Sequence, residues 1–476
     1  MPVFCMRFFM KSGHFPPKEV VTAMMNKLRN TFVLVWKVGT FALTAAVFFL
    51  LFSIRNPFLI APSRTALITG LAYLFVYVLM TRVYGGFDIG RKKSRPIIYS
   101  VCLNVLAADL AAHLFLCIMN YTVVHNRHFV YEQPLLLLLS IVLQSLLIIV
   151  LTYAGNGCYF HFVKPQRCLV VTAPGSDVRR LTAKIAAFRK QYRIERIVTI
   201  HDRDLLSHID AHDAIFICNL AAEERHMLVE YCYSQKKDFY YTLEMVDLVA
   251  LGSDRVMFDD TPMMHSSPKG LTMEQRIIKR ASDIILAVFA LILTSPIMLI
   301  TALAIKLEDG GSVFYKQKRA TYGGRTFDVY KFRSMHEEDG SIHRSVTKDD
   351  DRITKVGKVI RKFRIDELPQ FINVLKSDMS FVGPRPEMIE NMEKYTRELP
   401  EFSYRLWAKA GLTGMAQVYG KYNTSPKEKL ALDMIYIEQY SILLDIKLLL
   451  RTILVLFTPE DSTAAFDFDD EELSAK

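Results

Sequence analysis

The first third of the chain alternates long apolar runs with short polar loops. Each run approaches the roughly 20 residues that a helix needs to cross a bilayer. The first begins only after Trp36, too late for a cleavable signal peptide. The pattern therefore predicts an N-terminal arm over residues 1–37 and a four-helix transmembrane bundle over residues 38–157. The runs cover residues 38–54, 65–81, 97–120 and 134–154.

Basic residues in the loops orient these four helices. They cluster in the N-terminal arm and in the second loop, and the positive-inside rule places both segments in the cytoplasm. After four crossings the chain returns to the cytoplasm near Lys164 and Arg167. The basic residues are Lys18, Lys27, Arg29 and Lys37 in the arm, and Arg82, Arg91, Lys92, Lys93 and Arg95 in the loop.

The third apolar run carries an acid, Asp109, together with Asn104 and His113. An ionisable residue inside a membrane often marks a functional site. It can also make a polar contact between helices, and we favour this interpretation.

Short apolar stretches alternate with amphipathic ones from Cys168 onward. We expect strands at 168–172, 196–200 and 214–218, and helices at 177–190 and 221–237, followed by an extended run at 238–243. Strands that alternate with helices are typical of a parallel, Rossmann-like sheet. We therefore predict such a domain over residues 158–270.

This predicted domain lacks the signature of a dinucleotide site. After its first strand the chain reads Ala173-Pro174-Gly175-Ser176-Asp177, without the glycines that let a backbone approach a pyrophosphate. Tyr233 and Lys237 have the Tyr-x-x-x-Lys spacing of short-chain dehydrogenases, but chance explains it better without that fingerprint. We expect a degenerate Rossmann-like accessory domain without catalysis.

A fifth apolar run covers residues 284–305, and two features argue that it does not cross the membrane. Ser295-Pro296 lies at its centre, where proline removes a helix hydrogen bond and kinks the axis. Basic residues flank both ends, so a crossing would place one group outside. A re-entrant helix that bends within one leaflet keeps both groups in the cytoplasm. They are Arg276, Lys279 and Arg280 before the run, and Lys306, Lys316, Lys318 and Arg319 after it.

Composition supports a membrane protein. Of the 476 residues 51% are hydrophobic, and the formal charge is +10. A nucleic-acid binder would show a concentrated basic patch or a known motif, and we find neither. The seven cysteines fit no zinc spacing, and their odd number argues against a disulfide framework.

The densest candidate chemistry lies between residues 363 and 387. Asp366 and Glu367 precede Pro369, which suits the first turn of a helix that continues through Leu375. Arg385 follows, held between the prolines of Gly383-Pro384-Arg385-Pro386. A guanidinium grips phosphate oxygens, while carboxylates hold Mg²⁺ or attack phosphorus. These residues predict a compact site for a metal-bound phosphate.

Several motifs in a fixed order resemble the monotopic phosphoglycosyl transferases, the bacterial sugar transferase family, over residues 275–457. In its large members a similar N-terminal half precedes the catalytic part. The resemblance implies an α-rich catalytic domain over residues 271–458 with the re-entrant helix. Besides the acid block, the motifs are Lys279-Arg280-Ala281-Ser282-Asp283, Tyr330-Lys331-Phe332-Arg333-Ser334-Met335, Gly411-Leu412-Thr413-Gly414 with Gln417, and Leu432-Asp433.

The resemblance implies a ping-pong reaction between two phosphate-bearing substrates. The donor is a UDP-sugar, the acceptor is undecaprenyl phosphate, and UMP leaves. Asp366 would attack the sugar-linked phosphorus, and Asp366 and Glu367 would hold Mg²⁺. Such a reaction starts capsule, exopolysaccharide or O-antigen assembly at the cytoplasmic face of the bacterial inner membrane. The sequence does not identify the transferred sugar, although we favour a hexose.

Further residues receive roles mostly by their positions in these motifs. Lys331 and Arg385 would hold phosphate charge, with Arg333 as a weaker candidate two residues along the same strand face. The resemblance assigns Gly414, Gln417, Lys421 and Asp433 to the nucleotide sugar. Two positions depart from the family pattern, because Ala410 replaces a proline and Lys421 replaces an arginine. Asp433 could equally lie on a solvated helix face. We expect a structural role for Asp283, paired with Arg280 or with basic residues of the soluble part.

Two other functions stay open from the sequence. One is a non-catalytic membrane scaffold for polysaccharide assembly, and the other is a membrane-anchored nucleotide-sugar dehydratase or epimerase. The membrane helices and the middle domain offer surfaces for a homodimer. The acidic end of the chain, residues 459–476, is predicted to be disordered.

Overall fold

The computed structural model describes residues 18–123, 131, 133–267, 270–336, 352–420 and 424–457. The acidic end and residues 1–17 of the N-terminal arm lie outside these ranges. The chain forms two compact units, Met1–Thr242 and Leu243–Lys476. The second unit starts earlier than the boundary at residue 271 expected from the sequence, because α9 (Met245–Gly252) packs against α15 (Pro426–Glu438).

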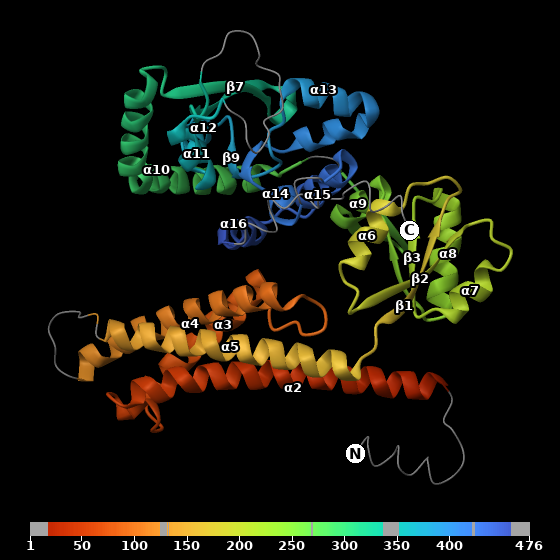
Figure 1. Ribbon diagram of the computed structural model, residues 1–476, viewed down its shortest axis with the longest axis horizontal. Coiled ribbons are helices and arrows are strands. Elements are labelled where there is room, and N and C mark those ends of the chain that lie inside the picture. Colours follow the sequence, from red (N-terminus) through yellow and green to blue (C-terminus); the bar gives the residue numbers. More distant parts are fainter. Residues whose placement is uncertain are drawn as a thin grey trace. The chain divides into compact units, whose positions relative to one another are not determined.

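The first unit begins with four apolar helices that lie side by side (Figure 1). All four are long and apolar enough to cross a membrane, as the sequence predicts. Their inward faces form one core that contains Phe48, Tyr73 and Ile148, while many leucines on the outward faces are exposed. The helices are α2 (Lys18–Ser53), α3 (Arg64–Tyr84), α4 (Ser94–Val123) and α5 (Pro134–Phe162), with a short 3₁₀ turn η1 (Pro57–Leu59) after α2.

The acid in α4 makes the interhelical contact that we favoured. Ser140 Oγ and Gln144 Nε2, both from α5, donate to the carboxylate of Asp109 at 2.9 and 3.1 Å. Gln144 also donates to the carbonyl of Thr44 in α2 at 3.0 Å. These hydrogen bonds between buried groups link α2, α4 and α5, and so they favour one pairing of the three helices.

A four-stranded parallel sheet follows, in the order β2-β1-β3-β4. The parallel sheet predicted from the sequence is therefore confirmed, although its second strand begins at Tyr192 rather than at residue 196. Leu169, Val171 and Ile217 are buried beneath α7 and α8. The elements are β1 (Gln166–Thr172), α6 (Arg179–Ala186), β2 (Tyr192–Thr199), α7 (Leu205–Ala211), β3 (Ala214–Cys218), α8 (Ala222–Ser234) and β4 (Asp238–Tyr241).

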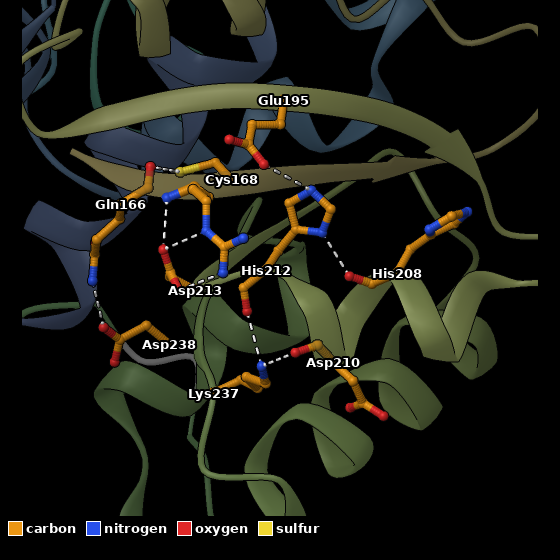
Figure 2. Close-up of polar contacts among 10 residues, drawn as sticks. Gln166, Cys168, Glu195, His208, Asp210, His212, Asp213, Lys237 and Asp238 are labelled. Carbon is orange, nitrogen blue, oxygen red and sulfur yellow. Dashed lines mark hydrogen bonds and ion pairs between the residues drawn. The ribbon is translucent and has the colours of Figure 1, made fainter. Parts of the chain in front are cut away.

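Polar contacts close the amino edge of this sheet (Figure 2). Lys237 donates to the carbonyl oxygens of Asp210 and His212 at 2.6 and 2.9 Å, and Arg167 pairs with Asp213. Ligands of such sheets bind at the opposite, carboxyl edge. Lys237 therefore ties a loop to the sheet at the edge away from the expected ligand side, and the Tyr233 side chain is 78% exposed.

The second unit packs short helices and strand pairs around a core that contains Val382, Phe402, Met434 and Leu448. After α9 come the hairpin β5 (Asp254–Phe258) and β6 (Thr261–His265), then α10 (Met273–Asp309), β7 (Phe314–Ala320), η2 (Tyr322–Gly324) and β8 (Thr326–Phe332). The chain continues with α11 (Lys355–Lys362), η3 (Ile365–Glu367), α12 (Gln370–Leu375), β9 (Ser380–Val382), α13 (Ile389–Glu398) and η4 (Pro400–Trp407). It ends with β10 (Gly411–Thr413), α14 (Met415–Tyr419), α15 and α16 (Ile442–Phe457).

The fifth apolar run lies within the long helix α10. Thr272 caps its start by accepting from the backbone N–H of Gln275, and Gly310 ends it in the left-handed conformation. Pro296 lies inside the helix, and Figure 1 shows α10 as two limbs that run in different directions. Large apolar side chains such as Ile285, Phe289 and Leu299 are about two-thirds exposed, so α10 offers an apolar surface on both sides of the proline.

Candidate functional site

The two acids of the site lie in a tight turn between two helices. Helix α11 ends at Lys362, and Arg364 then adopts a left-handed conformation with a φ of 55°. Glycine usually fills such a position, because a side chain is strained there. The reversal leads into η3, which contains Asp366 and Glu367, and Pro369 then caps α12. The acids therefore precede the helix in a 3₁₀ turn of their own.

Two contacts fix α12 behind the acids. Asn373 is fully buried; its Oδ1 accepts from the backbone N–H of Tyr330 at 2.9 Å, and its Nδ2 donates to the carbonyl of Asp328 at 2.8 Å. Arg280 of α10 donates to the carbonyls of Val374 and Leu375, both at 2.7 Å. These bonds hold α12 against β8 and α10, and they thereby position the two acids that precede α12.

Glu367 forms the centre of a charge cluster. Its Oε1 lies 3.2 Å from Lys331 Nζ and 3.2 Å from Arg385 Nη2. Burial opposes ionisation of Glu367, but Arg385 and Lys331 outweigh burial and lower its pKa to about 2. The structure therefore brings together an ionised carboxylate and the two cations expected to hold phosphate.

Asp366 differs from its neighbour. Burial, and after it the negative charge of Glu367, raise the pKa of Asp366 above its ordinary value, while Lys331 and Arg361 act in the opposite direction. Asp366 is half-buried beside the cation pair. Two adjacent acids thus have pKa values that are pushed apart, an arrangement that is typical of acids with separate chemical roles.

A cavity of about 200 Å³ opens beside Glu367. Gln417 lines it with both polar atoms of its amide buried, and neither atom has a hydrogen-bond partner among the residues that the structure describes. An amide buried in this way needs a partner. The other residues of the lining are Arg364, Leu368, Phe371, Leu412, Thr413, Val418, Thr452 and Val455.

Other residues predicted for the site lie apart from this cluster. Arg333 is buried and pairs with Asp309 at the end of α10, so the structure does not bring it to the acids. Asp433 is 1% exposed and pairs with Arg405 at 2.7 Å, away from the lining of the cavity and from any solvated face. A side chain at Gly414 would meet the carbonyl of Gly383, so this glycine lets two loops approach. Lys421 lies outside the described residues.

Two predictions about α10 have different outcomes. Ser295 and Pro296 lie inside the helix, at the place expected from the sequence. The expectation for Asp283 is wrong, because its carboxylate accepts from Ser380 Oγ and from the backbone N–H of Phe381, both at 2.9 Å, and not from Arg280. Arg280 instead caps α12. Asp283 still has a structural role, since it joins α10 to β9.

Sequence reasoning missed Arg280, Asn373 and Arg405 as supports of the site. The partners of Arg280 and Asn373 lie dozens of residues away, so local spacing gives no signal for them. Arg364, which lines the cavity, was also missed. It stands two residues after the end of α11, in a left-handed conformation that a glycine usually adopts.

Carboxylates for a metal are few in this region. The described part of the chain contains no group of three or more His, Cys, Asp or Glu side chains close enough to share a metal ion. The adjacent Asp366 and Glu367 remain, and magnesium in phosphoryl transfer sites usually takes one or two carboxylates plus substrate phosphates. The donor set therefore fits magnesium only together with a phosphate ligand.

Comparison with known proteins finds relatives of the C-terminal part of the chain. Residues 274–459 match the family described as "Bacterial sugar transferase". A UDP-N-acetylgalactosamine-undecaprenyl-phosphate N-acetylgalactosaminephosphotransferase of Aeromonas hydrophila is 45% identical over 185 residues, which cover 38% of this chain and 44% of that protein. A UDP-glucose:undecaprenyl-phosphate glucose-1-phosphate transferase of Caulobacter vibrioides is 40% identical over 190 residues. The match covers 39% of this chain and 71% of that protein.

A third relative, from Escherichia coli, is also named UDP-glucose:undecaprenyl-phosphate glucose-1-phosphate transferase, and it is 41% identical over 184 residues. The match covers 37% of this chain and 40% of that protein. The chain thus spans less than half the length of the first and third relatives and about seven-tenths of the second. This protein belongs to the bacterial sugar transferase family.

Proposed function

We propose that this protein transfers a sugar 1-phosphate from a UDP-sugar to undecaprenyl phosphate, with release of UMP. The observation that carries the proposal is the cluster in which Lys331 and Arg385 flank Glu367 next to Asp366. Two cations beside two acids suit a diphosphate that is bound and then cleaved. The relatives named above act on UDP-sugars and undecaprenyl phosphate according to their names.

The proposed reaction has two steps at one phosphorus atom. An oxygen of Asp366 attacks the sugar-linked phosphorus, the bond from that phosphorus to the bridging oxygen breaks, and UMP leaves with the electron pair. A phosphate oxygen of the lipid then attacks the same phosphorus and displaces Asp366. Lys331 and Arg385 bind phosphate oxygens in both steps, and the product is undecaprenyl-diphosphate-sugar.

Gln417 is the residue that we assign to the uracil. Its buried amide carries a donor and an acceptor that have no partners in the described part of the chain, and the imide edge of uracil offers the complementary pair. Phe371 and Leu368 give the same cavity apolar walls. Gly414, Lys421 and Asp433 stay predictions for the nucleotide sugar, and the burial of Asp433 argues for another role.

Release of UMP tests the function directly. Purified full-length protein is incubated with undecaprenyl phosphate and, separately, with UDP-glucose, UDP-galactose and UDP-N-acetyl sugars. We expect UMP from at least one donor, and a hexose is our preference. UMP from none of them would favour a membrane scaffold, and conversion of the sugar without UMP would favour a dehydratase or epimerase.

Magnesium would be held by Asp366 and Glu367 together with substrate phosphates. When bound, it would neutralise charge on the diphosphate. We expect that excess EDTA lowers UMP release at least tenfold, because without the metal ion the two acids repel the diphosphate, and Lys331 and Arg385 alone leave part of that negative charge unbalanced. Added Mg²⁺ should restore the rate, and a rate that EDTA leaves unchanged would remove magnesium from the proposal.

We further propose that α2 to α5 form a transmembrane bundle in the bacterial inner membrane and that α10 is re-entrant, with the site on the cytoplasmic face. Basic residues on both sides of the apolar run support this topology, as does the change of direction of α10 in Figure 1. The site would then meet a lipid phosphate at the membrane surface. A homodimer through the N-terminal half stays a prediction.

Replacing Pro296 by Leu should disturb this topology. Proline within a helix costs about 3 kcal/mol, so its removal favours a straight helix by a factor of more than about 100. We expect a fraction of molecules to expose a C-terminal tag outside the cell, with a matching loss of UMP release. Proteolysis of the tag in intact spheroplasts measures this fraction.

Thr294→Leu is the matched control, because it makes the same helix more apolar and leaves the proline in place. We expect this variant to keep the tag inside. If Pro296→Leu also keeps the tag inside and retains full activity, the proline is not what holds α10 in one leaflet.

A further inference from the structure

The segment that carries Arg385 is held at every carbonyl from Pro384 to Glu387. The backbone N–H of Gly411 donates to Pro384 O at 2.9 Å, and Arg405 Nη2 donates to Arg385 O at 2.9 Å. Arg319 Nη1 donates to Pro386 O at 3.2 Å, and the N–H of Ala320 donates to Glu387 O at 3.3 Å. Because four donors from three elements, β7, η4 and β10, meet this short segment, the backbone that carries the Arg385 side chain is fixed.

Arg405 is the more deeply buried of the two guanidinium donors to this segment. Its side chain is 2% exposed, and burying a guanidinium without a partner is costly. Asp433 of α15, which is 1% exposed, supplies that partner at 2.7 Å, and Glu387 lies 3.5 Å from Nη1. Lys429 lies 3.3 Å from Glu387 on its other side.

Arg405 is therefore connected to the site through a single residue, Arg385. Arg405 contacts the carbonyl of Arg385, and the side chain of Arg385 reaches Glu367 at 3.2 Å. Arg405 and Asp433 do not line the cavity beside Glu367. A substrate bound in the cavity would therefore not contact Arg405 or Asp433. Arg405 does contact Arg385, the residue expected to bind the phosphate of that substrate.

We propose that Asp433 and Arg405 are positioning residues for Arg385. Asp433 orients the Arg405 guanidinium, and Arg405 holds the Arg385 carbonyl so that the Arg385 side chain meets the phosphate groups of the donor. This inference rests on the proposed function, since it assumes that Arg385 binds the diphosphate. It replaces the direct contact with the nucleotide sugar that the sequence suggests for Asp433.

Misplacement of a binding group by about 1 Å can cost on the order of 100-fold in rate. We therefore expect Asp433→Asn, which keeps the size of the side chain and removes its charge, to slow the release of UMP at saturating UDP-sugar by about 10- to 100-fold. The rate constant should fall more than the apparent affinity for UDP-sugar, because the donor can still enter the cavity.

A double-mutant cycle with Arg385→Ala separates positioning from general damage. If Asp433 acts through Arg385, its loss has little left to disturb once the Arg385 side chain is gone. We expect Arg385→Ala/Asp433→Asn to release UMP in a single turnover within about threefold of Arg385→Ala alone. Losses that multiply would overturn the proposal, as would an Asp433→Asn variant with the wild-type rate.

Asp445→Asn is the matched control. Asp445 is likewise a buried acid of this unit, 5% exposed. It pairs with Lys279 at 2.7 Å and accepts from Tyr436 Oη at 2.9 Å, and neither partner donates to a carbonyl of Pro384–Glu387. We expect its effect to multiply with that of Arg385→Ala. Thermal unfolding in detergent shows whether both Asn variants are folded. If Asp433→Asn is not, Arg405→Lys takes its place in the same cycle.

The wild-type protein distinguishes the two proposals. If it releases no UMP from any UDP-sugar, the proposed function fails. If it releases UMP and the losses multiply in the cycle, only the positioning role fails.

Discussion

Asp366→Asn should abolish formation of a phosphosugar–enzyme intermediate and lower UMP release by about 1,000-fold or more, as expected when a nucleophile is removed. The amide has the shape of the carboxylate but lacks an ionised oxygen to attack phosphorus. Lys331, Glu367 and Arg385 keep their mutual contacts in this variant, because the two ion pairs between them do not involve the Asp366 side chain. The donor should therefore still bind.

The measurement uses donor labelled in its sugar, with no lipid acceptor present. Wild-type protein should retain label after denaturing gel electrophoresis, because the second step cannot proceed, and the variant should retain none. Asp378→Asn is the control, since Asp378 pairs with Arg325 in the same unit and has no contact with the cluster. Label on Asp366→Asn but not on Glu367→Gln would reverse the roles of the two acids.

The same labelling assay should depend on pH. Burial and the adjacent charge of Glu367 raise the pKa of Asp366, so its ionised form is lost at a higher pH than that of an ordinary aspartate as the solution is acidified. Labelling should fall with the ionised fraction. Glu367→Gln removes the adjacent charge, and it should move the residual acid limb to lower pH. An acid limb that does not move would show that another group controls it.

Features that depend on neighbouring residues could be predicted from the sequence. Each of three features is encoded in a short stretch of sequence: the acid pair, the arginine between two prolines and the strand with Lys331. The structure brings them together around Glu367. The parallel sheet follows in the same way from alternating strands and helices. In these cases the residues that define the local sequence pattern are also the residues that the fold uses at those positions.

Features that depend on long-range packing could not be predicted. Arg333 follows Lys331 by two residues, which suggests the same strand face, but β8 ends at Phe332 and the guanidinium turns to Asp309 instead. Asp433 lies on a helix that could have been solvated, and only the approach of η4 with Arg405 buries it. Asn373 supports the site through two backbone groups of β8, and no sequence spacing predicts such a contact.

Arg385→Ala should lower the rate of UMP release by about 100- to 1,000-fold, the cost that is typical for a donor that stabilises developing charge in an active site. Two effects act in the same direction. The variant loses the guanidinium that grips phosphate oxygens. It also leaves Glu367 with Lys331 as its one ion-pair partner among the described residues, so more negative charge faces the incoming diphosphate.

Arg385→Lys distinguishes charge from geometry. An ammonium group can balance Glu367, but it cannot offer two parallel N–H donors to a phosphate. If bidentate grip matters, Arg385→Lys should recover no more than about a tenth of the activity, although it should restore the stability of the protein to thermal unfolding in detergent. If lysine restores full activity, Arg385 acts only as the counter-charge of Glu367. In that case the backbone contacts that fix its segment would serve the stability of the turn rather than the placement of a phosphate.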